Sequence, residues 1–312
     1  MKYTDFNGYR ISQITLGTVQ LGMDYGINNI VGQPNNETAN AILSAAINGG
    51  INTFDTSSDY GTSEIIIGDY FASHKKNKPF IVTKCSVKDW NIVLSENEVE
   101  RRLRVQVEKS IEKLKCDKLS LLLLHDERDI DSYGKLLPKI LDRFVKENLI
   151  ERAGVSLNHF SYIDKILSSD IFHAVQLPLN MMNIKDTSGD GIKKLVKKNI
   201  IVFIRSVFLQ GLFFRDPQTL PQGVLQKAKE PLQKLRRLAD EVSIPIKELA
   251  VSYIRDLEGV TSLVMGAEKP EQVEENISLI NCKPLPEKVR TKIIDTFKDV
   301  GEEVLSPWLW NK

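Results

Sequence analysis

Residues 50–61 read Gly-Ile-Asn-Thr-Phe-Asp-Thr-Ser-Ser-Asp-Tyr-Gly, an apolar run that ends on the carboxylate of Asp55 and leads to Tyr60 in a loop closed by glycine. A short apolar run bounded by glycine and turn residues is typical of a buried strand. An isolated charge at the end of such a strand costs free energy unless it has partners. The stretch therefore predicts a strand whose carboxyl end carries part of a functional site.

Two later apolar runs end in the same way, the first on Lys84 and the second on His125. Taken singly, each polar group has a common structural explanation, such as Asp55 capping its own loop or Tyr60 packing with a hydrated hydroxyl. A set of an acid, a phenol, an amine and an imidazole after three successive predicted strands instead indicates one shared site.

Short apolar runs alternate with amphipathic segments along the whole chain. The clearest helix begins at Ser95, where Glu98 completes a capping-box pattern ahead of apolar residues at helical spacing. No linker or low-complexity stretch divides the sequence, so a single domain over residues 1–312 is expected. The candidate strands lie near residues 13–16, 51–55, 80–84, 119–124, 152–155, 172–176, 201–205 and 261–264.

This alternation of eight strand-then-helix units over about 250 residues predicts an α/β fold, a (β/α)8 TIM barrel. A doubly wound open sheet is the alternative, but residues 17–22 after the first strand do not match G-x-G-x-x-G. Ahead of the barrel, residues 3–6 and 9–11 predict an N-terminal β-hairpin, because Asn7-Gly8 favours a type I′ turn. Active sites of such barrels lie at the carboxyl ends of the strands, which is where the polar groups described above fall.

Composition places the chain among ordinary globular proteins. Its formal net charge of +1 gives no sign of a nucleic-acid-binding surface. Three widely spaced cysteines fit a reducing compartment, and the four histidines lack metal-ligand spacing. The sequence shows neither a signal peptide nor an apolar stretch of membrane-spanning length. We therefore expect a cytoplasmic protein that binds no metal, no membrane and no nucleic acid.

The four polar groups suggest proton transfer to a carbonyl oxygen. A free phenol has a pKa of about 10, which is too high for efficient proton exchange near neutrality. We expect the ammonium of Lys84, held by Asp55, to lower the pKa of Tyr60, while His125 orients the substrate oxygen by a hydrogen bond. Such a general acid suits carbonyl reduction with a hydride from a nicotinamide.

With these residues, the chain resembles the aldo-keto reductase superfamily, and the resemblance runs from the predicted hairpin to at least Asn276. The most specific part is residues 50–57, with 60–61 and 64–68 at the family's spacing. The family's catalytic tetrad falls, in the family's order, on Asp55, Tyr60, Lys84 and His125. The resemblance implies a barrel that binds NADP(H) in an extended form without a Rossmann loop.

The resemblance also implies a set of cofactor contacts. Ser156 and Gln176 match the residues that hold the nicotinamide carboxamide, and Arg205 stands where many members stack a tyrosine. A planar guanidinium can stack in that place. The loop after Arg205 covers the cofactor pyrophosphate in relatives. The implied cofactor-binding residues are Gly17, Thr18, Asp55, Ser156, Gln176, Arg205, Ser206, Phe208, Gly211, Gly266, Lys269, Gln272 and Asn276.

Residues 264–276 match the adenosine end of the cofactor site. Pro270 opens a predicted helix, and Lys269 with the helix N-terminus could bind a 2′-phosphate. Gln272 stands where many NADP-dependent relatives carry an arginine, and four glutamates, Glu268 among them, place negative charge nearby. NADP is the cofactor that the resemblance favours, and NAD stays open.

The favoured function is an NAD(P)(H)-dependent reductase that converts an aldehyde or ketone into an alcohol, with Tyr60 as general acid. The loop at residues 22–29 resembles a bacterial branch with members linked to sugar or polysaccharide metabolism, so a sugar-like carbonyl is expected. One alternative is a regulatory protein that uses nicotinamide as a redox sensor, as in potassium-channel β-subunits. Another is a Schiff-base lyase with Lys84 as nucleophile. The substrate, the oligomeric state and the direction of the reaction stay open.

Overall fold

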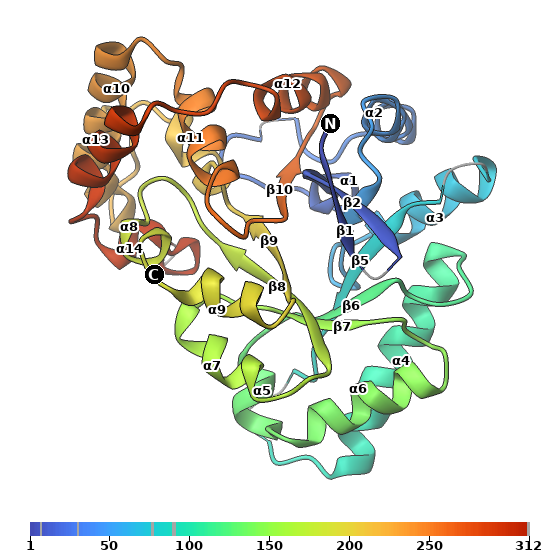
Figure 1. The fold of residues 1–312 in the computed structure, drawn as a ribbon. Coiled ribbons are helices and arrows are strands. Elements are labelled where there is room, and N and C mark those ends of the chain that lie inside the picture. Colours follow the sequence, from blue (N-terminus) through green and yellow to red (C-terminus); the bar gives the residue numbers. More distant parts are fainter. Residues whose placement is uncertain (7, 30, 76–77, 89–91, 311–312) are drawn as a thin grey trace.

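Eight parallel strands close into a barrel in the order β10-β3-β4-β5-β6-β7-β8-β9 (Figure 1). The structure is a computed structural model that describes residues 1–6, 8–29, 31–75, 78–88 and 92–310. The barrel strands are β3 (Ile14–Gly17), β4 (Thr53–Asp55), β5 (Phe80–Cys85), β6 (Leu121–Leu124), β7 (Ala153–Ser156), β8 (Phe172–Pro178), β9 (Ile201–Arg205) and β10 (Ser262–Gly266). The predicted (β/α)8 barrel is confirmed.

The strands read as continuous apolar runs because both of their faces are buried. In β6, Leu121 and Leu123 point into the barrel, where they pack with Phe80, Phe203 and other interior side chains. Leu122 and the other alternate residues of β6 belong instead to the large core between the barrel and its helices. Because successive side chains of a strand point to opposite faces, the four leucines of β6 alternate between the barrel interior and the core under the helices.

Helices cover the outside of the barrel (Figure 1). The α-helices are α1 (Val19–Gly22), α2 (Asn36–Asn48), α3 (Ser63–Ser73), α4 (Glu96–Leu114), α5 (Arg128–Tyr133), α6 (Leu136–Lys146), α7 (Ile163–Leu167), α8 (Ile184–Thr187), α9 (Gly191–Lys197), α10 (Lys229–Val242), α11 (Ile246–Arg255), α12 (Pro270–Ile280), α13 (Glu287–Phe297) and α14 (Glu302–Leu305). Short 3₁₀ segments lie at Phe160–Tyr162, Leu209–Phe214, Val224–Ala228 and Pro307–Leu309.

The start of α4 confirms half of the predicted capping box. The Ser95 side chain accepts a hydrogen bond from the backbone N–H of Glu98 at 3.3 Å. The Glu98 carboxylate, however, binds the guanidinium groups of Arg101 and Arg102 on its own helix. The carboxylate therefore takes a charged partner one turn along rather than the backbone N–H of Ser95.

The predicted N-terminal hairpin is also confirmed. Strands β1 (Tyr3–Phe6) and β2 (Tyr9–Ser12) pair antiparallel, and Gly8 has the positive φ of 89° that such a turn needs. Asn7, the other turn residue, lies outside the described residues. Phe6 packs into the barrel interior from the amino-terminal end. The hairpin thus leaves the carboxyl ends of the strands as the open end of the barrel. No helix in the described part of the chain is long and apolar enough to cross a membrane.

Candidate active site

The predicted tetrad meets at the carboxyl end of the barrel. Asp55 is the last residue of β4, Lys84 lies near the end of β5, and His125 follows β6. The Lys84 ammonium donates to both carboxylate oxygens of Asp55 at 2.7 and 2.8 Å and to the carbonyl of Thr56 at 2.8 Å. Three acceptors satisfy the three ammonium protons. Lys84 can therefore be buried at this position, with an exposed fraction of only 1%.

Tyr60 lies beside this ion pair in the loop between β4 and α3. The Lys84 Nζ is 5.0 Å from the Tyr60 ring centroid, and the His125 ring meets the Tyr60 ring edge-on at a centroid distance of 5.8 Å. Gly22 lets the end of α1 touch this loop, because a Cβ on residue 22 would lie only 1.9 Å from the Tyr60 carbonyl oxygen. The loop that carries the phenol is therefore held by backbone packing as well as by its own turn.

The expectation that Lys84 lowers the pKa of Tyr60 is wrong for the protein without a ligand. Burial raises the pKa of the Tyr60 phenol above its usual value, and the negative charge of Asp55 adds to this rise. The positive charge of Arg205 opposes the rise in pKa without overcoming it. The physical reason is that burial, which disfavours the charged phenolate, outweighs the positive charge nearby, and the Lys84 ammonium is already engaged by Asp55.

His125 has two partners that the sequence did not suggest. Its Nδ1 lies 3.2 Å from the hydroxyl of Ser57 and 3.6 Å from the carboxylate of Asp59, which in turn pairs with Lys88 at 2.6 Å. Burial is the largest influence and lowers the pKa of His125, whereas Asp59 opposes that decrease. A neutral imidazole can donate from only one nitrogen, so the partner at Nδ1 decides what Nε2 offers. Both partners lie within the opening stretch, but no local motif marks them.

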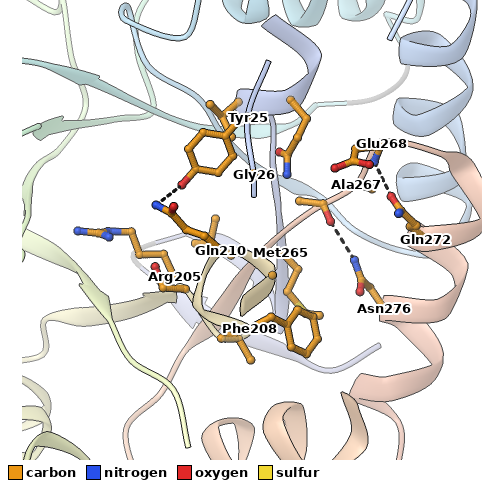
Figure 2. A pocket seen from close by; sticks show the side chains of 18 of the residues that line it. Tyr25, Gly26, Arg205, Phe208, Gln210, Met265, Ala267, Glu268, Gln272 and Asn276 are labelled. Carbon is orange, nitrogen blue, oxygen red and sulfur yellow. Dashed lines mark hydrogen bonds between the residues drawn. The ribbon is translucent and has the colours of Figure 1, made fainter. Parts of the chain in front are cut away.

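A cavity of about 620 Å³ begins beside Tyr60 and runs past the ends of β3 and β10 to α12 (Figure 2). Most of the expected cofactor residues line it. They are Gly17, Thr18, Asp55, Gln176, Arg205, Ser206, Phe208, Gly211, Gly266, Gln272 and Asn276. The cavity size falls within the range of small-molecule and cofactor sites.

Four of the expected residues are not on the cavity wall. Lys84 and His125 lie behind the wall, where Lys84 contacts Asp55 and His125 contacts Tyr60. Ser156 donates to the Gln176 side-chain oxygen at 3.4 Å, and the Gln176 amide donates to Asp55 at 2.7 Å. Lys269 precedes α12 as its N-cap and is not among the residues that line the cavity.

The cavity wall also includes residues that sequence reasoning missed. Tyr25 accepts a hydrogen bond from the side chain of Gln210 at 3.0 Å, and Asn28 donates to the carbonyl of Gly211 at 2.6 Å. These two contacts join the loop after β3 to the loop after β9, and Figure 2 shows the one between Tyr25 and Gln210. The sequence draws attention to the loop at residues 22–29 through its resemblance to relatives, but it does not predict these contacts with the loop after β9.

Arg205 is anchored rather than free. Its Nη2 donates to the carbonyl of Leu157 at 3.1 Å and to the side-chain oxygen of Asn158 at 2.7 Å. The guanidinium therefore bridges from the end of β9 to the end of β7 and keeps a fixed orientation at the cavity wall. Among the described residues, no group of three or more histidine, cysteine or acidic side chains is arranged to hold a metal ion.

A closed parallel barrel with polar groups and a deep cavity at its carboxyl end defines an enzyme-like (β/α)8 barrel. The model of the aldo/keto reductase family matches residues 13–296, and the chain belongs to this family. An uncharacterized oxidoreductase of Bacillus subtilis is 24% identical over 290 residues, which cover 89% of this chain and 90% of that protein. An NADH-specific methylglyoxal reductase of Escherichia coli is 22% identical, with 74% of this chain and 79% of that protein covered.

Solved structures share the fold. The holo form of aldo-keto reductase AKR11C1 from Bacillus halodurans superposes with a TM-score of 0.76 at 20% identity, covering 95% of this chain and 96% of that one. The glycerol dehydrogenase AKR11B4 from Gluconobacter oxydans gives a TM-score of 0.77 at 21% identity, covering 96% of each chain. Both likenesses extend over nearly the whole barrel.

Proposed function

We propose that this protein reduces the carbonyl group of a small aldehyde or ketone to an alcohol with NADPH or NADH, and that Tyr60 donates the proton. The observation that carries the proposal is the position of Tyr60, between the Asp55–Lys84 ion pair and His125 and at one end of a long cavity. A reduced nicotinamide bound in the cavity would supply the hydride. Membership of the aldo/keto reductase family supports this class of reaction.

The roles of the polar groups follow from their environments. Tyr60 keeps its proton at neutral pH because a free phenol already has a pKa of about 10 and burial raises that pKa further. It can give the proton up as negative charge grows on a substrate oxygen. The phenolate that results is stabilised by the positive charge of Arg205 nearby. Neutral His125 orients the carbonyl group by a hydrogen bond.

The cavity suits an extended dinucleotide. It combines apolar side chains such as Phe208 and Met265 with amides and open backbone, as cofactor sites do. Its wall includes Gln20, whose buried side-chain oxygen has no hydrogen-bond partner among the described residues. An unpaired buried acceptor is costly, and a bound ligand with a donor would satisfy it. The resemblance favours NADPH over NADH.

A Schiff-base lyase is less favoured by the same geometry. A lysine nucleophile must reach its substrate as a free amine, but the Lys84 ammonium is buried behind Asp55 and donates to three acceptors. The regulatory alternative uses the same cofactor site, and only turnover distinguishes it from a reductase. The sugar-like carbonyl and the cytoplasmic location stay predictions.

The first test is a titration of the purified protein with NADPH and with NADH, followed by tryptophan fluorescence. We expect saturable binding of at least one of them, followed by its oxidation when carbonyl compounds such as methylglyoxal and glyceraldehyde are added. Binding without any oxidation across a broad carbonyl panel would favour the regulatory alternative. Failure of both dinucleotides to bind would contradict the proposed function.

A further inference from the structure

The end of the cavity farthest from Tyr60 is formed by the chain after β10 and by α12. Glu268, Gln272 and Asn276 lie together there, opposite the end that carries Tyr25 and Arg205 (Figure 2). If the reacting ring of a dinucleotide lies beside Tyr60, its adenosine lies at this far end. This placement of the adenosine, and with it the role inferred for the far end of the cavity, rests on the proposed function.

This far end of the cavity has an excess of negative charge. Its lining contains two carboxylates, Glu268 and Glu275, and one amine, Lys247 from α11. Lys247 donates to both carboxylate oxygens of Glu275 at 2.6 Å, so its charge is already compensated. The side chain of Glu268 has no hydrogen-bond or ion-pair partner among the described residues.

Glu268 is also held in place. Its backbone N–H donates to the side-chain oxygen of Gln272 at 2.6 Å, which fixes the segment at the start of α12. The Glu268 side chain is half-buried, and this burial raises the pKa of its carboxyl group, with a smaller opposing influence from Lys269. A half-buried carboxylate without a partner favours ligands that bring hydrogen-bond donors.

The adenosine riboses of NADH and NADPH differ in the hydrogen-bond donors that they offer to such a carboxylate. In NADH the ribose carries free 2′- and 3′-hydroxyls, which are donors, and Gln20 offers a second unpaired acceptor on the same cavity wall. In NADPH the 2′-position carries a phosphate with about −1.5 to −2 charges and only acceptor oxygens. Placing that phosphate near an uncompensated carboxylate is repulsive.

We propose that Glu268 determines cofactor choice in this protein and that the cavity selects NADH over NADPH. Glu268 accepts hydrogen bonds from a ribose diol and repels a 2′-phosphate. This choice is opposite to the one that the resemblance favours. The difference arises because Lys269, the expected phosphate ligand, is absent from the cavity wall, whereas Glu268 is part of it.

The test is the ratio of the two dissociation constants, measured on the full chain by fluorescence or calorimetric titration with NADH and NADPH. We expect wild type to bind NADH at least about tenfold more tightly. Glu268→Gln should reduce the ratio by about tenfold, mainly through tighter NADPH binding, because it removes charge and keeps the side-chain size. Glu268→Arg should favour NADPH outright.

Glu271→Gln is the matched control. It removes the same charge from an exposed residue in the first turn of α12 that does not line the cavity, so the ratio should stay unchanged. Tighter NADPH binding by wild type would overturn the inference alone, because the dinucleotide site itself would then be present. An equal effect of both substitutions would also overturn it. Binding of neither dinucleotide would overturn the inference together with the proposed function.

Discussion

Lys84 and Asp55 form a buried ion pair at the ends of two neighbouring strands, beside the phenol of Tyr60. The pair is almost fully buried, and each partner depends on the other, because a lone buried charge costs several kcal/mol. Their fixed geometry supports the position of Tyr60, but burial has the largest influence on the phenol pKa, and the Asp55 carboxylate raises that pKa further. The uncompensated positive charge near Tyr60 belongs to Arg205.

This residue-scale picture predicts the pH dependence of reduction. A general acid must be protonated, and the pKa of Tyr60 is raised above its ordinary value of about 10. The acid form is therefore fully present at lower pH and is lost only as the pH rises through that raised pKa. We expect kcat/KM for carbonyl reduction to stay level between pH 7 and about 9. A decline with an apparent pKa of about 7 to 8 would mean that Lys84 lowers the phenol pKa, as the sequence suggested.

At the scale of elements, the loop from β4 to α3 is positioned by its contact with α1. The Gly22→Ala substitution tests this contact, since the new Cβ would lie 1.9 Å from the Tyr60 carbonyl oxygen and 2.5 Å from the Ser63 N. Overpacking of this kind costs about 1–3 kcal/mol, and a displacement of about 1 Å at a catalytic group can cost about 10²-fold in rate. We expect a lower unfolding temperature and a large loss of turnover.

Gly189→Ala serves as the control for that substitution. A Cβ on residue 189, between α8 and α9, would have its nearest neighbour, the Lys185 carbonyl oxygen, at 3.4 Å, which is an ordinary contact, and Gly189 does not line the cavity. Thermal unfolding followed by circular dichroism and turnover with the same carbonyl substrate should separate the two variants. If Gly22→Ala kept the turnover of Gly189→Ala, the contact between α1 and the tyrosine loop would have no catalytic importance.

At the scale of the whole molecule, the sequence predicted the barrel and the tetrad but not the charges around the cavity. The barrel could be predicted because its strands are short, largely apolar runs buried on both faces, and three of them carry a polar group at or just after the carboxyl end. The spacing of Asp55 and Tyr60 is local, so the opening stretch contains it. These features need no knowledge of distant contacts.

The partners of the charged groups could not be predicted, because they come from packing between distant elements. Lys247 meets Glu275 only where α11 packs against α12, and Arg205 reaches Asn158 only when β7 and β9 share the barrel end. The expected lowering of the Tyr60 pKa is wrong for a related reason. The sequence predicts that Asp55 holds Lys84, but it does not show how deeply the fold buries the phenol, and that burial raises its pKa.

The most direct test of the account is a comparison of wild type with Tyr60→Phe, in which dinucleotide binding and carbonyl reduction are measured separately. The substitution removes the hydroxyl and keeps the ring that packs beside His125, so binding should change little while turnover falls by about 10²–10⁴-fold. Tyr162→Phe, which removes a surface phenol that is hydrogen-bonded to Asp131, should leave both unchanged. Wild-type turnover in Tyr60→Phe would contradict the account, because a different group would then have to supply the proton.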